Sequence, residues 1–175
     1  MSTLFTVGYG AWKTTARMAG LLAGLQQAGV TTLIDTRHSP CASATDPRSF
    51  YGPKDWNLQP TGGMAEALAR QGIRYLWLVE LGNPQKNDPA MQVLKWQLAD
   101  EQGNWPIHRG LRQLADLVRA QPHTCGLLCA CEQYETCHRR LVAEAVRDRY
   151  FGGDLSIQNI GSRRVEHKSP GSSIH

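Results

Sequence analysis

The order strand, helix, strand at the start of the chain is the feature that most limits the possible folds. Residues 3–7 are rich in β-forming side chains and stop at Gly8-Tyr9-Gly10, which predicts a strand ending in a tight turn. Apolar residues then recur at helical spacing between residues 18 and 28, Gly29 closes that segment, and residues 30–36 predict a second strand. This order is typical of a parallel sheet, because parallel neighbours need a crossover connection.

The rest of the chain continues the alternation of strands and helices. Further strands are predicted at residues 73–79, 124–130 and 155–160, and further helices at residues 65–71, 89–100, 110–121 and 136–150. Residues 37–60 carry repeated proline and glycine and predict a long loop. We therefore expect an α/β fold of three layers, with a largely parallel sheet of about five strands and helices on both faces. Trp77 and Trp96 are expected in the core.

Length and composition predict one domain. A chain of 175 residues with 41% hydrophobic residues can build one core, which we place at residues 1–160, followed by a disordered basic tail at 161–175. The net charge of +4 is spread along the chain among 15 acidic residues. The start of the chain lacks a secretory pattern and no run reaches about eighteen apolar residues, so we expect a cytoplasmic protein with no membrane partner.

Cysteine is concentrated in one short segment. The chain has five cysteines, and Cys125, Cys129, Cys131 and Cys137 lie close together. Disulfides are rare in the cytoplasm, so these thiols need another explanation. Strand alternation places Cys125, Cys129 and Cys131 on one face, with Cys129 and Cys131 at the carboxyl end of the strand, where parallel sheets bind ligands.

The segment that follows predicts the start of a helix. Thr136 is the expected N-cap, which places Cys137, His138 and Arg139 in the first helical turn. The positive end of a helix favours an anion and lowers the pKa of a thiol. An arginine such as Arg139 offers a planar pair of donors to a phosphate or a carboxylate.

Three interpretations of this segment remain open. In the catalytic one, Cys131 or Cys137 is the nucleophile and His138 exchanges protons, although adjacent residues usually point apart, so the base could come from elsewhere. In the second, Cys129, Cys131 and Cys137 bind a metal with His138 as a further candidate. Because the cysteine spacing differs from that of a zinc finger, none of these residues is predicted as a metal ligand. In the third, the cysteines pack in the core, which suits Cys125 best.

A second group of polar residues follows the second predicted strand. Asp35 and Arg37 lie at its carboxyl end with Ser39 just beyond, and Gly8 and Tyr9 end the first strand at the same edge. Asp35 and Arg37 could bind a ligand or pair with each other.

These residues resemble a known family. The segments Thr6-Val7-Gly8-Tyr9-Gly10, Ile34-Asp35-Thr36-Arg37 with Pro40, and Leu128-Cys129 with Cys137-His138-Arg139 are similar to the bacterial and archaeal family called domain of unknown function 488, in the subgroup with Cys-Ala-Cys before Cys-His-Arg. The resemblance runs from about residue 4 to residue 160 and implies a compact α/β fold, without an established activity, substrate or cofactor. Leu81-Gly82-Asn83 departs from the Leu-Gly-Gly of the family.

The leading functional hypothesis is a cysteine-dependent enzyme that acts on a small anionic or nucleotide-like substrate. The candidate catalytic residues are Cys131, Cys137, His138 and Asp35, and the candidate substrate-binding residues are Gly8, Tyr9, Arg37, Ser39 and Arg139. The alternative is a non-catalytic module that binds nucleic acid or a protein partner, with structural or metal-binding cysteines. The sequence assigns no cofactor and no oligomeric state.

Overall fold

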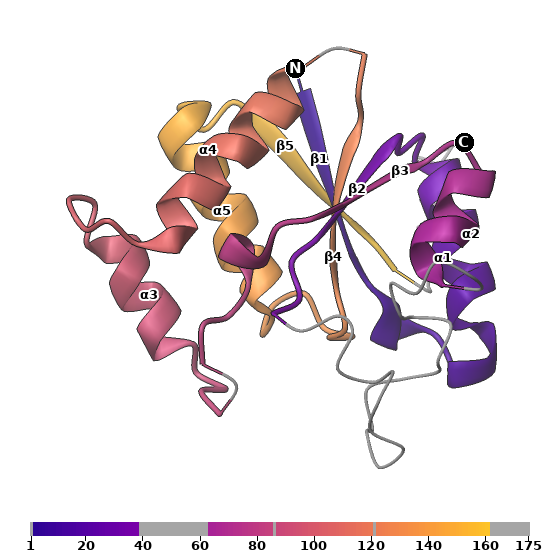
Figure 1. The fold of residues 1–175 in the computed structure, drawn as a ribbon, viewed down its shortest axis with the longest axis horizontal. Coiled ribbons are helices and arrows are strands. Elements are labelled where there is room, and N and C mark those ends of the chain that lie inside the picture. The colour runs from indigo at the N-terminus through magenta and orange to yellow at the C-terminus, as the bar shows by residue number, and fades with distance from the viewer. Residues whose placement is uncertain (1, 39–62, 86, 121, 162–175) are drawn as a thin grey trace, which may run out of the picture.

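The fold contains five strands and five α-helices in the part of the chain that the computed structural model describes, residues 2–38, 63–85, 87–120 and 122–161 (Figure 1). The strands are β1 (Ser2–Gly8), β2 (Thr32–Asp35), β3 (Arg74–Trp77), β4 (Cys125–Cys129) and β5 (Leu155–Ile160). The helices are α1 (Arg17–Gln27), α2 (Met64–Arg70), α3 (Gln92–Ala99), α4 (Pro106–Arg119) and α5 (His138–Tyr150). The predicted tail, from residue 162 on, and most of the predicted loop lie outside the described residues.

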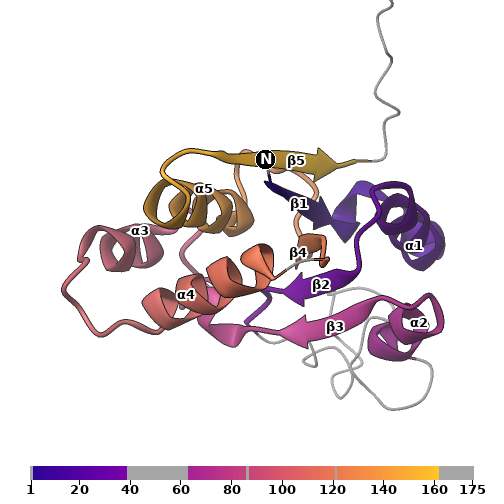
Figure 2. The ribbon, with the colours of Figure 1, turned by 90° about the horizontal axis from the view of Figure 1, so that it is seen from above.

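All strand pairs are parallel, and the strand order is β3-β2-β4-β1-β5. Figure 2 shows α1 and α2 on one side of the sheet and α4 and α5 on the other, with α3 beside α4. The predicted three-layer α/β class is therefore confirmed. The order of the strands places β4 between β1 and β2, although β4 follows them by about a hundred residues of sequence.

Alternation along the buried strands divides the core in two. In β4, Leu127 packs with the helices α4 and α5, whereas its neighbour Leu128 packs with α1 and α2. In β2, Ile34 and Leu33 divide in the same way. Because both of its faces are covered, the central strand β4 is buried throughout and carries no alternating polar residues.

Glycine ends two of the helices as the sequence predicts. Gly29 follows α1 with a φ of +66° and Gly72 follows α2 with a φ of +71°. Both lie in the left-handed region that glycine adopts without a Cβ clash. The start of α5 differs from the prediction by one residue, because Cys137 rather than Thr136 is the N-cap and His138 is the first helical residue.

The expectation that two tryptophans lie in the core is wrong. Trp77 is 44% exposed because it ends the edge strand β3, where its Nε1 donates to the carbonyl oxygen of Arg37 at 2.9 Å. Trp96 is 56% exposed and contacts the Trp105 ring, with 4.8 Å between ring centroids. Among the described residues, none of the helices has the length and apolar character needed to cross a bilayer.

Truncating Leu127 tests the importance of the central strand. Leu127 is fully buried in β4, so Leu127→Ala should lower the free energy of unfolding by about 2–5 kcal/mol in urea titrations. The exposed Gln158 on β5 provides the control. Gln158→Ala should change the free energy of unfolding by less than about 0.5 kcal/mol. Equal losses in the two variants would contradict the assignment of β4 to the core.

Candidate functional site

The carboxyl ends of three adjacent strands meet at one edge of the sheet. Asp35 at the end of β2 is level with Leu128 on β4, and Gly8 at the end of β1 is level with Cys129. Residues from three distant parts of the sequence therefore lie together. Parallel sheets bind ligands at this edge, where the loops that follow the strands can surround a small group.

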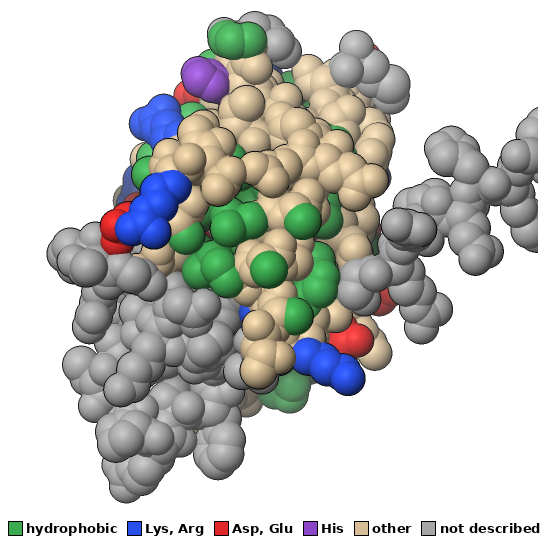
Figure 3. Space-filling model, turned by 90° about the vertical axis from the view of Figure 1, so that its right-hand side faces the viewer, with side chains coloured by type: hydrophobic (Ala, Val, Ile, Leu, Met, Phe, Trp, Pro, Cys, Tyr) green, Lys and Arg blue, Asp and Glu red, His purple; other side chains and the backbone are tan. Residues whose placement is uncertain are grey.

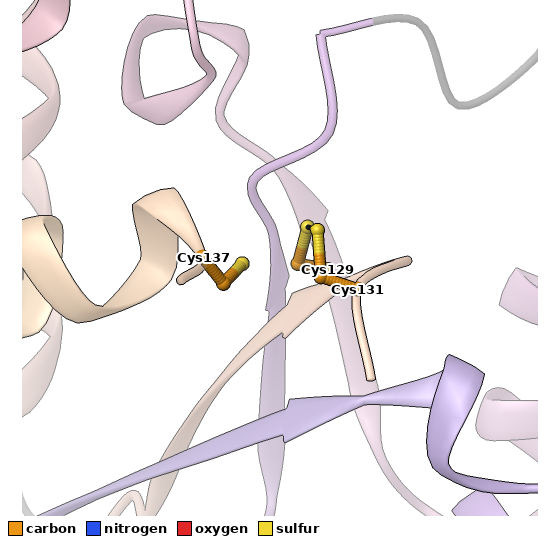
Figure 4. Close-up of side chains that lie close together, drawn as sticks. All are labelled: Cys129, Cys131 and Cys137. Carbon is orange, nitrogen blue, oxygen red and sulfur yellow. Dashed lines mark hydrogen bonds between the residues drawn. The ribbon is translucent and has the colours of Figure 1, made fainter. Parts of the chain in front are cut away.

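Three cysteines converge at this edge. Cys129 is the last residue of β4, Cys131 lies in the turn that follows, and Cys137 caps α5. Their sulfur atoms all lie within 4.8 Å of one another, and Cys129 Sγ is 3.7 Å from Cys131 Sγ. Figure 4 shows the Cys137 side chain directed from the helix toward the other two. Cys129 and Cys137 are buried, whereas Cys131 is exposed.

His138 completes the cluster. Its Nδ1 is 3.7 Å from Cys129 Sγ and 3.8 Å from Cys137 Sγ. The expectation that Cys137 and His138 point apart is wrong, because Cys137 has the extended backbone of an N-cap while His138 already belongs to the helix. The change of backbone conformation between the two residues brings both side chains to the same side.

Thr36 fixes the tautomer of His138. The Nε2 atom lies 3.0 Å from the Thr36 carbonyl oxygen and 2.9 Å from its hydroxyl, and that hydroxyl donates to the Leu128 carbonyl oxygen at 2.8 Å. A carbonyl oxygen only accepts, so Nε2 carries the hydrogen. In the neutral imidazole the lone pair of Nδ1 therefore faces the sulfur atoms.

The crowded thiols change one another's pKa. The hydrogen bond from Cys129 to Cys131, together with burial, raises the pKa of Cys129 to about 12. Hydrogen bonds with Cys129 and Cys131, together with burial, also raise the pKa of Cys137. The pKa of Cys131 is lowered, chiefly because Cys129 and Cys137 donate hydrogen bonds to its sulfur. Burial disfavours a charged His138, but its contacts with Cys137, the Thr36 carbonyl group and Cys131 together outweigh burial and raise the pKa of His138.

Arg139 holds the turn that carries Cys131. Its fully buried guanidinium donates from Nη1 to the Cys131 carbonyl oxygen at 2.9 Å and from Nη2 to the Glu132 carbonyl oxygen at 3.2 Å. Gly8 packs against the same carbonyl, since a Cβ added there would lie 1.7 Å from the Cys131 oxygen and 2.8 Å from Arg139 Nη1. Gly8 and Arg139 therefore position Cys131.

Asp35 and Arg37 pair with each other. The fully buried Asp35 carboxylate accepts from Arg37 Nη2 at 2.5 Å and from its Nε at 2.9 and 3.0 Å, and Tyr75 donates to it at 2.6 Å. The Arg37 guanidinium also lies over the Tyr9 ring, 5.4 Å from the centroid. Burial disfavours the charged guanidinium, but Asp35 outweighs burial and raises the pKa of Arg37. This pair orders the end of β2 beside the cysteines.

Thr36 and Tyr75 contact the site although neither was a predicted site residue. Thr36 lies between Asp35 and Arg37, and the alternation of side chains continues beyond the end of β2. The Thr36 side chain therefore faces His138. On the other side, Asp35 contacts Tyr75 and Arg37 contacts Tyr9. The alternation itself could have identified Thr36. No local pattern marks Tyr75, because its contact with Asp35 depends on the pairing of β2 with β3.

Ser39 and Pro40 lie outside the described residues. Gly82, in the turn where the chain departs from the family pattern, lies against β2, and a Cβ added there would be 3.2 Å from the Thr36 carbonyl oxygen. This turn therefore borders the residue that orients His138.

Comparison with known proteins identifies a family. Residues 60–146 match the model of the family described as Domain of unknown function DUF488. The match includes Cys129, Cys131, Cys137 and His138, and it starts after β1 and β2. The chain matches no curated protein and no solved structure.

Adding a methyl group at Gly8 tests how Cys131 is positioned. Gly8→Ala should displace the Cys131 carbonyl group and lower the free energy of unfolding by about 1–3 kcal/mol, because backbone and Arg139 both occupy the space. It should also change the rate at which Cys131 reacts with a chromogenic disulfide.

Gly126→Ala is the matched control on the neighbouring strand. A Cβ there meets only ordinary contacts, with the nearest atom of Val30 at 3.4 Å. Unchanged Cys131 reactivity in Gly8→Ala would contradict the role of Gly8.

Proposed function

We propose that this chain, whose residues 60–146 match the DUF488 family model, is a metal-binding domain that holds one thiophilic ion such as Zn²⁺. The proposed ligands are the sulfur atoms of Cys129, Cys131 and Cys137 and the Nδ1 atom of His138. The observation that carries the proposal is the convergence of three sulfur atoms within 4.8 Å of one another. Thiolate and imidazole together suit zinc, which is typically bound by four such ligands.

The spacing of the ligand atoms supports a single tetrahedral ion. Zinc–sulfur bonds of about 2.3 Å place two sulfur ligands about 3.8 Å apart, and a sulfur and a nitrogen ligand about 3.6 Å apart. The distance between Cys129 Sγ and Cys131 Sγ is 3.7 Å, and His138 Nδ1 lies 3.7 and 3.8 Å from two sulfur atoms. Small side-chain rotations would bring the other pairs of proposed ligand atoms to the distances that a tetrahedral zinc ion requires.

The hydrogen bond from His138 Nε2 also fits a metal ligand. Histidine ligands commonly donate their other ring N–H to a carbonyl or carboxylate, which fixes the ring and its tautomer. The Thr36 carbonyl oxygen accepts such a bond at 3.0 Å. The lone pair that a metal would need is therefore already directed toward the cysteines.

Charge gives a further reason for an ion at this place. Three thiols crowded together can ionise only in part, as the raised pKa values of Cys129 and Cys137 indicate. A divalent ion replaces their protons and leaves a complex with one net negative charge. The first turn of α5 lies beside that charge, and the positive end of a helix stabilises it.

A second candidate function is nucleophilic catalysis by Cys131. Its exposure and lowered pKa favour it, because the thiolate is the reactive form of cysteine. The anion-binding part of this hypothesis has less support. Arg37 donates to Asp35, and Arg139 donates to two backbone carbonyl groups, so both guanidinium groups already have protein partners.

Binding of nucleic acid would need a basic surface. Figure 3 shows the side of the molecule that carries α1 and α2, where lysine and arginine side chains are few and separated. On that side the described residues form no basic stripe of the kind that phosphate contacts require.

Removal of single cysteines tests the metal site. Purified wild-type protein should contain about one zinc ion per chain, and Cys137→Ser should bind it at least about tenfold more weakly because one of four ligands is lost. Cys125→Ser is the matched control, since Cys125 is buried at the start of the same strand, outside the cluster. Zinc content and competition with a chromogenic chelator provide the measurements. Equal affinities of the two variants would contradict the proposal.

Zinc binding should release protons and strengthen as the pH rises. Cys129, with its pKa raised to about 12, and Cys137 keep their protons at neutral pH in the metal-free chain. The ion must displace these protons, so the apparent affinity should rise about tenfold per pH unit for each proton displaced, between about pH 6 and 8.

Titration calorimetry in buffers of different ionisation enthalpy counts the protons released. Binding without proton release would argue against thiolate ligands. Zinc binding to Cys137→Ser should release fewer protons than binding to the wild-type protein, which would show that Cys137 supplies one of the released protons.

A further inference from the structure

The three thiols of the cluster differ in access. Cys131 is exposed, whereas Cys129 and Cys137 are buried behind it. Cys129 Sγ lies 3.7 Å from Cys131 Sγ, and Figure 4 shows these two side chains next to each other at the end of β4, with Cys137 approaching from α5. An exposed thiol can attack a disulfide from solution, and a second thiol directly behind it can then resolve the mixed disulfide.

We propose that Cys131 exchanges with low-molecular-weight disulfides, that Cys129 resolves the mixed disulfide, and that this reaction ejects the metal ion from the cluster. The exchange depends only on the two thiols. The ejection of the ion rests on the metal site proposed above. The domain then binds its ion under reducing conditions and loses it when small disulfides accumulate.

The first step uses Cys131. Its thiolate attacks one sulfur atom of the small disulfide, the disulfide bond breaks, and one small thiolate leaves. Cys131 is then joined to the other half of the reagent. Of the three thiols, Cys131 alone is exposed, so it is the one that a disulfide from solution can reach. The backbone of Cys131 is held by Arg139, which keeps the sulfur in place for the second step.

The second step uses Cys129. In the metal-free chain its proton passes to Nδ1 of His138, 3.7 Å away, and the thiolate attacks the Cys131 sulfur. The bond to the reagent breaks and a second small thiolate leaves. The protein now holds a disulfide between Cys129 and Cys131, and the reagent has gained the two electrons and become two thiols. In the metal-bound chain Cys129 is already a thiolate and needs no base.

The loss of two ligands explains the release of the ion. A disulfide between Cys129 and Cys131 leaves Cys137 and His138 as the remaining proposed ligands, which is fewer than a zinc site uses. Cys129 Sγ and Cys131 Sγ are 3.7 Å apart at the end of one strand, whereas Cys137 approaches this pair from the start of α5. We therefore expect the disulfide to join Cys129 to Cys131 and not to Cys137.

The test uses oxidised glutathione as the disulfide and the 175-residue chain with Cys41→Ser, which leaves Cys125, Cys129, Cys131 and Cys137 as its four thiols. Intact-mass spectrometry follows the protein, peptide mapping locates the linkage, and a chromogenic chelator reports released zinc. We expect a Cys129–Cys131 disulfide and zinc release with the same time course. Cys125→Ser should behave like the parent protein.

Two variants separate the steps. Cys129→Ser should stop after the first step and keep glutathione attached to Cys131. Cys131→Ser should form a glutathione adduct at least about tenfold more slowly than the parent, because the remaining thiols of the cluster are buried. A Cys129–Cys137 linkage, an adduct that never resolves in the parent protein, or fast reaction of Cys131→Ser would each overturn the inference.

The same reaction on zinc-free protein keeps this inference distinct from the metal site. A parent protein that binds no zinc yet forms the Cys129–Cys131 disulfide would support the exchange and refute the proposed metal site. A parent protein that binds zinc and forms no disulfide would refute the exchange and leave the metal site standing.

Discussion

The buried hydrogen bond between Nε2 of His138 and the carbonyl oxygen of Thr36 connects the start of α5 to the end of β2. It fixes the tautomer of the ring and directs Nδ1 toward two of the three thiols. The bond can form only because β4 lies directly beside β2, so that the turn after β4 returns the chain over the end of β2. The geometry of the candidate site thus depends on the pairing of strands that are distant in sequence.

Much of the fold could be predicted from local patterns. Apolar runs and helical periodicity predicted every strand and α-helix among the described residues, and glycine marked the ends of α1 and α2, whereas the short 3-10 helices were not predicted. The strand order could not be predicted in this way, because it depends on long-range packing. The exposure of Trp77 has the same cause: the sequence does not show that β3 is an edge strand.

The position of the candidate site was also predictable, but its contacts were not. Cys129, Cys131, Cys137 and His138 lie at the sheet edge where the cysteine spacing placed them. The convergence of Cys137 and His138 depends on an N-cap one residue later than predicted. The partners of Arg37 and Arg139 come from folded geometry, and they indicate that both arginines position the site.

The proposed metal site and the proposed exchange reaction use the same property of the cluster, which is the close approach of thiols that differ in exposure. Burial and mutual hydrogen bonds keep protons on Cys129 and Cys137 until an ion displaces them. The exposed Cys131 remains open to reagents from solution. Gly8 and Arg139 maintain this arrangement by holding the Cys131 backbone.

X-ray absorption spectroscopy of the zinc-loaded protein tests the central claim most directly. The account predicts a four-coordinate ion with three sulfur ligands at about 2.3 Å and one imidazole nitrogen at about 2.0 Å. A spectrum with only oxygen and nitrogen neighbours, or a protein that retains no zinc after desalting, would contradict it.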